Sequence, residues 1–174
     1  MTASCATLDL DAYDATKAAV TQDPEKGKGA FETVTEWTDG AQALTRARSF
    51  VLKTDEPAPL GGRDEHIDPM ELLLASLGTC LTIGWVTQAR KRGIDYRGLR
   101  IKVTAPFDLR GYLGIDSAVR PGFQKLEYVV EVDTDADQAT LDAIVAATEA
   151  GSPMFDNILN ATAISGRVAR GPVV

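Results

Sequence analysis

Apolar and polar residues change their spacing several times along the chain, and each spacing predicts a type of element. Apolar positions in residues 9–22 recur at helical spacing and predict a weakly amphipathic helix that ends at Asp23-Pro24. Period-two alternation follows in residues 31–37 and, after a glycine-containing turn, in residues 42–57. These two runs predict the strands of a β-hairpin.

A polar, turn-rich loop leads into the most informative segment, residues 68–93, whose first two thirds are apolar nearly all round. Asp68 is a favourable N-cap, Pro69 suits the first helical position, and Gly93 can serve as the C-cap. Because a helix without a polar face must be covered on most sides, we expect it in a core or at a subunit interface.

The second half of the chain returns to strand-like alternation, followed by helical spacing and a final strand. Together with the first half, this order predicts an α+β protein whose strands are antiparallel and whose central helix must be covered. The expected elements are strands at residues 99–106 and 123–133, helices at 135–150 and from Ser152-Pro153 to Leu159, and a last strand at about 161–169.

Composition and charge narrow the class of protein. Hydrophobic residues make up 44% and charged residues 25% of 174 residues, which is typical of one soluble globular domain. The net charge of −7 and the dispersed basic residues argue against a nucleic-acid-binding surface. The N-terminus lacks the basic and apolar regions of a signal peptide, and no uninterrupted apolar run is long enough to span a bilayer. We therefore expect a cytoplasmic protein without a membrane-bound part.

The thiols and the single histidine limit the chemistry that the chain can perform. Cys5 and Cys80 are too few and too far apart for a disulfide scaffold, so Cys80 is expected to be a free thiol in a reducing cytoplasm. With His66 as its one histidine, the chain has no multi-histidine metal site. We expect neither a metal nor another cofactor.

The run Pro69-Met70-Glu71-Leu72-Leu73, followed by Cys80, resembles the central-helix signature of the OsmC and organic-hydroperoxide-resistance family. Ser152-Pro153 at the head of a later helix is a second landmark, and the order of elements agrees over most of the chain. The resemblance implies an OsmC-like domain at residues 29–174, preceded by a helical extension and link at residues 1–28. It also implies an intertwined homodimer, with two long helices back to back and sheets wrapped around them.

The resemblance further implies roles for individual residues. Cys80 corresponds to the peroxidatic cysteine that reduces organic hydroperoxides, and Glu71 to a glutamate that helps to organise the site. Arg46 and Arg48 are both candidates for the arginine of the family's site, and the choice between them stays open. Ser152 occupies the position of the resolving cysteine, where a serine cannot form a disulfide.

A reactive Cys80 needs particular surroundings. A thiol attacks a peroxide as the thiolate, which a nearby arginine held by a carboxylate would favour. Glu71 and Cys80 are nine residues apart. On a straight helix, that spacing corresponds to a rise of about 13.5 Å and about half a revolution, so the two side chains point to opposite sides. If they share a site, a bent helix or a second subunit must bring them together, which favours a site at a subunit interface.

Each candidate residue also has a structural interpretation. A cysteine among small residues in an apolar helix is usually a core residue. Glu71 fits the first turn of a helix, where negative charge is favourable, and Ser152 fits an N-cap. Arg46 and Arg48 fit the solvated face of an edge strand.

Two functions are compatible with these residues. In the first, a small apolar hydroperoxide oxidises Cys80 to a sulfenic acid, which an external thiol reduces. In the second, the chain is a catalytically inactive relative that binds a small apolar ligand at the dimer interface, and Cys80 is unreactive. Cys5 is a poor substitute for a resolving thiol because it lies in an N-terminal segment expected to be mobile, but a transient bridge to Cys80 stays open.

Overall fold

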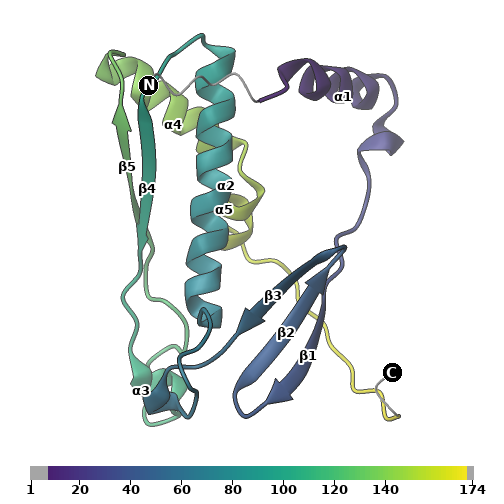
Figure 1. The fold of residues 1–174 in the computed structure, drawn as a ribbon, viewed down its shortest axis with the longest axis vertical. Helices are drawn as coiled ribbons and strands as arrows, with labels where there is room; N and C mark the ends of the chain where they lie inside the picture. The colour runs from purple at the N-terminus through teal and green to yellow at the C-terminus, as the bar shows by residue number, and fades with distance from the viewer. Residues whose placement is uncertain (1–7, 172–174) are drawn as a thin grey trace.

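The computed structural model describes residues 8–171 and has a long central helix, α2, with two separate β-sheets (Figure 1). A two-stranded sheet runs alongside α2, helices α4 and α5 pack against α2, and a three-stranded sheet extends from its lower end. This arrangement confirms the predicted α+β class. The elements are α1 (Leu10–Gln22), η1 (Pro24–Gly27), β1 (Val34–Asp39), β2 (Gln42–Ala47), β3 (Phe50–Thr54), η2 (Ala58–Leu60), α2 (Pro69–Lys91), β4 (Gly98–Thr104), α3 (Leu109–Tyr112), β5 (Glu127–Asp133), α4 (Gln138–Ala150) and α5 (Pro153–Leu159).

Local capping groups set the ends of α2 where the sequence predicts them. The Asp68 carboxylate accepts a hydrogen bond from Met70 N at 2.6 Å, and Asp68 N donates to the Glu71 carboxylate at 3.1 Å. The second bond is one half of a capping box, and in the other half the Asp68 side chain accepts from the backbone N–H of Glu71. These bonds satisfy backbone N–H groups that have no partner within the helix. At the other end, Gly93 has a φ of +66°, which favours a glycine and terminates the helix.

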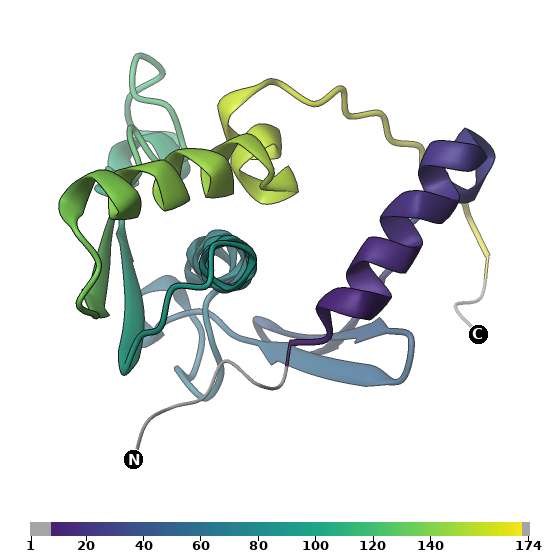
Figure 2. The same ribbon diagram turned by 90° about the horizontal axis from the view of Figure 1, so that it is seen from above.

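The core lies where α2 meets β4, β5 and α4. Trp85, Ala89 and Ile144 are buried together, and the Trp85 ring packs edge-to-face on Tyr96 with ring centroids 5.1 Å apart. Seen along α2, Figure 2 shows α4 on one side of the central helix and the two-stranded sheet of β4 and β5 on another. Among the described residues, α2 is the one helix long and apolar enough to cross a membrane by length and composition. One side of it packs in the core through Leu77, Leu81, Trp85 and Ala89, whereas Leu73 and Ile83 are exposed on the rest of its surface.

The three-stranded sheet corrects one prediction. Residues 42–57 were expected to form one strand, but the structure divides them into β2 and β3, which pair antiparallel through Ala47 and Phe50. The turn between the strands is Arg48-Ser49, and Arg48 has a φ of 56°. A two-residue turn without glycine or proline leaves the period-two alternation unbroken, so the sequence pattern does not reveal it.

The same sheet is left largely uncovered. Its strands pair with one another, but within residues 8–171 they make no extensive packing contact with another helix or strand. Trp37 is 75% exposed, and Phe50 and Val51 are also exposed. Helix α1, which confirms the prediction for residues 9–22, has no buried residue. It packs mainly against η1, and the Lys91 ammonium at the end of α2 lies 3.8 Å from the centroid of its Tyr13 ring.

The predicted last strand at residues 161–169 is wrong for the single chain. These residues follow α5 without regular secondary structure, and the side chains of Ile164 and Val168 are almost fully exposed. A strand requires a neighbouring strand to satisfy its backbone groups, and the described chain places none beside this segment. The sequence of this segment alternates as a strand does, but the described chain offers no neighbouring strand with which it could pair.

Candidate functional site

Cys80 lies in the middle of α2, is partly exposed, and contacts one residue from a distant part of the chain. Its Sγ atom is 3.2 Å from the Oγ atom of Ser152, at a hydrogen-bonding distance for sulfur. Ser152 is only 5% exposed. The two residues that the sequence comparison associates with the family's two cysteines therefore lie in direct contact.

The local sequence explains why Ser152 reaches α2. Gly151 ends α4, and Pro153 occupies the first position of α5, so the chain turns sharply between the two helices. Ser152 N donates to Glu149 O at 3.2 Å, and Ser152 Oγ accepts from Phe155 N at 3.1 Å. Its predicted role as an N-cap is confirmed. The same side chain thus caps α5 and contacts the thiol.

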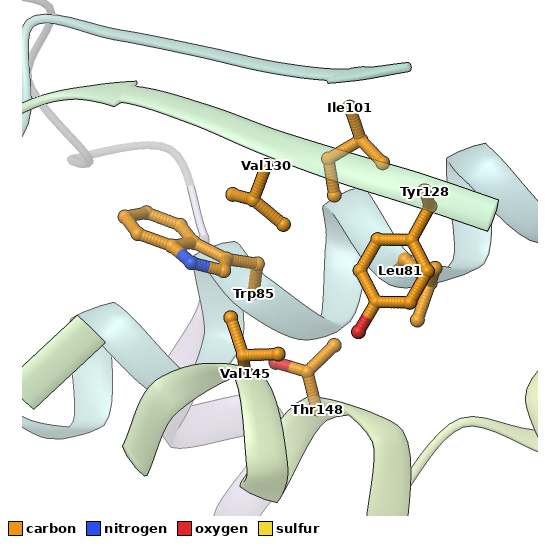
Figure 3. Close-up of a pocket in the computed structure, with 7 residues that line it drawn as sticks. All are labelled: Leu81, Trp85, Ile101, Tyr128, Val130, Val145 and Thr148. Atoms are coloured by element: carbon orange, nitrogen blue, oxygen red, sulfur yellow. The ribbon is translucent and has the colours of Figure 1, made fainter. Parts of the chain in front are cut away.

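An apolar wall lies beside the turn of α2 that follows Cys80 (Figure 3). The space among these side chains is too narrow to hold a water molecule, so it belongs to the packed core and is not a ligand cavity. The residues that surround it are Leu81, Trp85, Ile101, Tyr128, Val130, Val145 and Thr148.

One residue of this apolar cluster, Tyr128, also forms a hydrogen bond with a carboxylate. The Tyr128 hydroxyl donates to the Glu149 carboxylate. Burial of the phenol and this hydrogen bond raise the pKa of Tyr128, so it stays a neutral donor. Glu149 precedes Ser152 by one helical turn, so the pair also fixes the end of α4 from which Ser152 projects.

Glu71 and Cys80 are not joined in the described chain. Glu71 lies in the first turn of α2, where its carboxylate accepts from Asp68 N, and no hydrogen bond connects it to Cys80. Its structural interpretation as a first-turn residue is therefore confirmed. A shared site with Cys80 stays a hypothesis that requires a second chain.

Arg46 lies in β2 and Arg48 in the turn that joins β2 to β3, and neither contacts Cys80 in the described chain. Arg46 Nε is 3.8 Å from Glu36 Oε2, with Arg46 exposed and Glu36 partly exposed. The Arg48 guanidinium lies over the Phe50 ring, 5.1 Å from its centroid. The structure does not choose between the two arginines.

A buried carboxylate that sequence reasoning missed organises the loop before α2. Asp55 is 1% exposed, and it accepts from Glu56 N at 2.8 Å and from Arg63 N and Glu65 N at 3.2 Å each. The Gln42 amide donates to it as well, at 3.2 Å. Burial alone raises the pKa of a carboxyl, but these donors favour the ionised form and together lower the pKa of Asp55. An aspartate in a polar loop carries no sequence signal for this role.

Two other expectations concern metals and the second thiol. Within residues 8–171, no group of three or more His, Cys, Asp or Glu side chains is placed to hold a metal ion. Cys5, the alternative resolving thiol, lies outside the described residues.

The structure thus defines an α+β protein whose central helix carries a cysteine, packs beside an antiparallel sheet and faces the head of a later helix. A family model described as OsmC-like protein matches residues 62–165, more than half of the chain. The chain therefore belongs to the OsmC-like protein family. Among curated proteins, no sequence matches it.

Solved structures agree with the family assignment at the level of the fold. An OsmC-like protein from Mycoplasma pneumoniae is 12% identical, with a TM-score of 0.66 over 77% of this chain and 90% of that one. An organic hydroperoxide resistance protein OsmC from Legionella pneumophila is 19% identical, with a TM-score of 0.54 over 75% and 91%. An organic hydroperoxide resistance protein from Elizabethkingia anophelis is 14% identical, with a TM-score of 0.53 over 74% and 87%.

Proposed function

We propose that this protein is a one-cysteine peroxidase that reduces small organic hydroperoxides at Cys80 with an external thiol. The observation that carries the proposal is the contact between the partly exposed Cys80 thiol and the Ser152 hydroxyl, 3.2 Å apart. Two similar structures are named organic hydroperoxide resistance proteins, which supports the same class of substrate.

The chemistry requires no cofactor. The Cys80 thiolate attacks the distal oxygen of the hydroperoxide, the O–O bond breaks, and the leaving alkoxide takes a proton to become an alcohol. The sulfur is thereby oxidised to a sulfenic acid. An external thiol then displaces water to form a mixed disulfide, and a second thiol releases the Cys80 thiolate. Ser152 cannot take the place of that external thiol, because a hydroxyl forms no disulfide.

We further propose that a second copy of the chain completes the site. The open side of α2 exposes Leu73 and Ile83, and Ile83 is 63% exposed. The sheet that bears Arg46 and Arg48 is uncovered in its own chain. A homodimer in which the sheet of one protomer covers α2 of the other would shield both surfaces and supply an arginine to the thiolate.

Peroxide consumption by a matched set of variants tests the proposal. Purified wild type and Cys80→Ser are mixed with cumene hydroperoxide and excess dithiothreitol, and residual peroxide is followed by ferrous oxidation. We expect the wild type to consume peroxide over many turnovers and Cys80→Ser to fall to the rate without protein. Cys5→Ser is the control and should keep the wild-type rate. Equal consumption by wild type and Cys80→Ser would refute the proposal.

Binding without turnover is the second candidate function, and the exposed apolar residues of α2 favour it. In that case a small apolar ligand occupies the dimer interface, and Cys80 reacts with iodoacetamide no faster than free cysteine does. Faster alkylation of the folded protein at pH 7 than of its urea-unfolded form would count against this function.

A further inference from the structure

The Ser152 hydroxyl is bound on two sides, and the two bonds use different parts of it. A hydroxyl has one hydrogen to donate and two lone pairs that accept. One lone pair accepts from Phe155 N at 3.1 Å, which is the N-cap bond of α5. Among the described residues, the second hydrogen-bond partner of this oxygen is Cys80 Sγ at 3.2 Å.

The protonation state of Cys80 fixes the direction of that second bond. A neutral thiol can donate to the oxygen or accept from it. A thiolate has no hydrogen, so the bond can form only with Ser152 as donor. The capping bond holds the oxygen beside the sulfur and uses one lone pair, which leaves the hydroxyl hydrogen free to turn toward the sulfur. A hydroxyl donates a stronger hydrogen bond to a charged sulfur than to a neutral one, so the contact favours the thiolate over the thiol.

We infer that Ser152 is a thiolate-stabilising residue, whose hydroxyl donates to the ionised Cys80 and so promotes its reaction with electrophiles. The inference rests on the proposed function in that it explains how Cys80 becomes nucleophilic. The serine at the position of a resolving cysteine would then take part in the peroxidase cycle, although it forms no disulfide. It stabilises the attacking sulfur and leaves the later reduction to the external thiol.

The charged groups on the elements around α2 are engaged elsewhere. Glu149 of α4 is bound to the Tyr128 hydroxyl of β5, and Asp156 of α5 accepts from the Asn160 amide at 2.7 Å. The basic residues of β4, Arg100 and Lys102, lie on its exposed face. Within the described chain, the neutral hydroxyl of Ser152 is thus the polar side-chain group in hydrogen-bond contact with the sulfur.

The pH profile of Cys80 alkylation tests the inference without any peroxide. In a Cys5→Ser background, iodoacetamide labels only Cys80, and the rate is measured from pH 5 to 10 by intact mass. We expect Ser152→Ala to reduce the rate at pH 7 about fivefold and to move the rise of the profile to higher pH, since hydrogen bonds to charged groups are comparatively strong. Ser152→Thr, which keeps a hydroxyl and a cap, should restore most of the rate.

Two further variants distinguish the loss of the Ser152 hydroxyl from a general disturbance of the fold. Thr82→Val removes a nearby hydroxyl that donates to Gly78 O at 2.7 Å, and it should leave the profile unchanged. Ser152→Cys should form a disulfide with Cys80 on mild oxidation, which verifies the contact independently of the cap. Identical profiles for wild type, Ser152→Ala and Ser152→Thr would overturn the inference. If Ser152→Ala shifts the profile but wild type consumes no peroxide, the inference stands and the proposed peroxidase fails.

Discussion

At the scale of single residues, Asp55 fixes the loop that leads into α2. Its carboxylate accepts hydrogen bonds from backbone N–H groups of both parts of that loop, from Glu56 near its start and from Arg63 and Glu65 further along. Protonation would turn one carboxylate oxygen into a donor and weaken or break the bonds that this oxygen accepts. The start of the central helix therefore depends on a charge located directly after β3.

Substitution of Asp55 should make this dependence measurable. Because the folded protein lowers the pKa of Asp55, its contribution to the free energy of unfolding is complete above the unfolded pKa of about 3.9 and is lost as pH falls through the lower folded value. We expect Asp55→Asn to lower the urea midpoint at pH 7, and the difference from wild type to shrink between pH 5 and 2. Asp64→Asn is the control, since Asp64 is exposed in the same loop at a φ of 58°, which asparagine tolerates. A difference that is constant with pH would contradict the assignment.

At the scale of elements, the close approach of α2 and α4 depends on a glycine. A Cβ atom built on Gly84 would lie 2.9 Å from Thr148 Cγ2, and Thr148 is buried. On the same helix, a Cβ atom on Gly78 would meet only Val103 Cγ2, at an ordinary 3.4 Å. The two glycines of one helix therefore have different tolerance for a methyl group.

Alanine at these two positions should change stability in opposite directions. We expect Gly84→Ala to reduce the free energy of unfolding by about 1–3 kcal/mol, as overpacking does in a buried interface. Gly78→Ala should be neutral or should increase it, because alanine favours the helix by about 1 kcal/mol over glycine. The double variant Gly84→Ala with Thr148→Ser removes the opposing methyl group and should recover most of the loss. Urea unfolding followed by circular dichroism measures all three, and equal effects of the two single variants would rule out this packing argument.

The elements that the sequence predicts well are those whose signals are local. Asp68, Pro69 and Gly93 mark the ends of α2 because caps act within one turn, and Ser152 was identified as an N-cap in the same way. The turn at Arg48 has no such signal, since its positive φ is imposed by the pairing of β2 with β3. The contact of Ser152 with Cys80 joins residues 72 positions apart, so it depends on how α5 docks on α2 and no local pattern reveals it. Only the family resemblance indicated that these two positions are related.

At the scale of the whole molecule, the proposed dimer makes a specific prediction about Ile83. Replacing this exposed side chain on α2 with glutamate places a charge in the proposed interface, where burial of an unpaired charge is costly. We expect wild type to have twice the mass of the chain in multi-angle light scattering, and Ile83→Glu to be largely monomeric. Val129→Glu is the control, because Val129 is exposed between Glu127 and Glu131 on the outer face of β5. A wild-type monomer at micromolar concentration would contradict the dimer.

The uncovered sheet of β1, β2 and β3 has a consequence for how the chain reaches its final state. A small sheet that buries neither face has little stability of its own, so its strands gain protection only when another surface covers them. If that surface belongs to a second chain, the last step of folding is an encounter between two molecules. Its rate should then rise with protein concentration, and dilute, newly made chains should be cut by proteases between α1 and α2 before they are cut elsewhere.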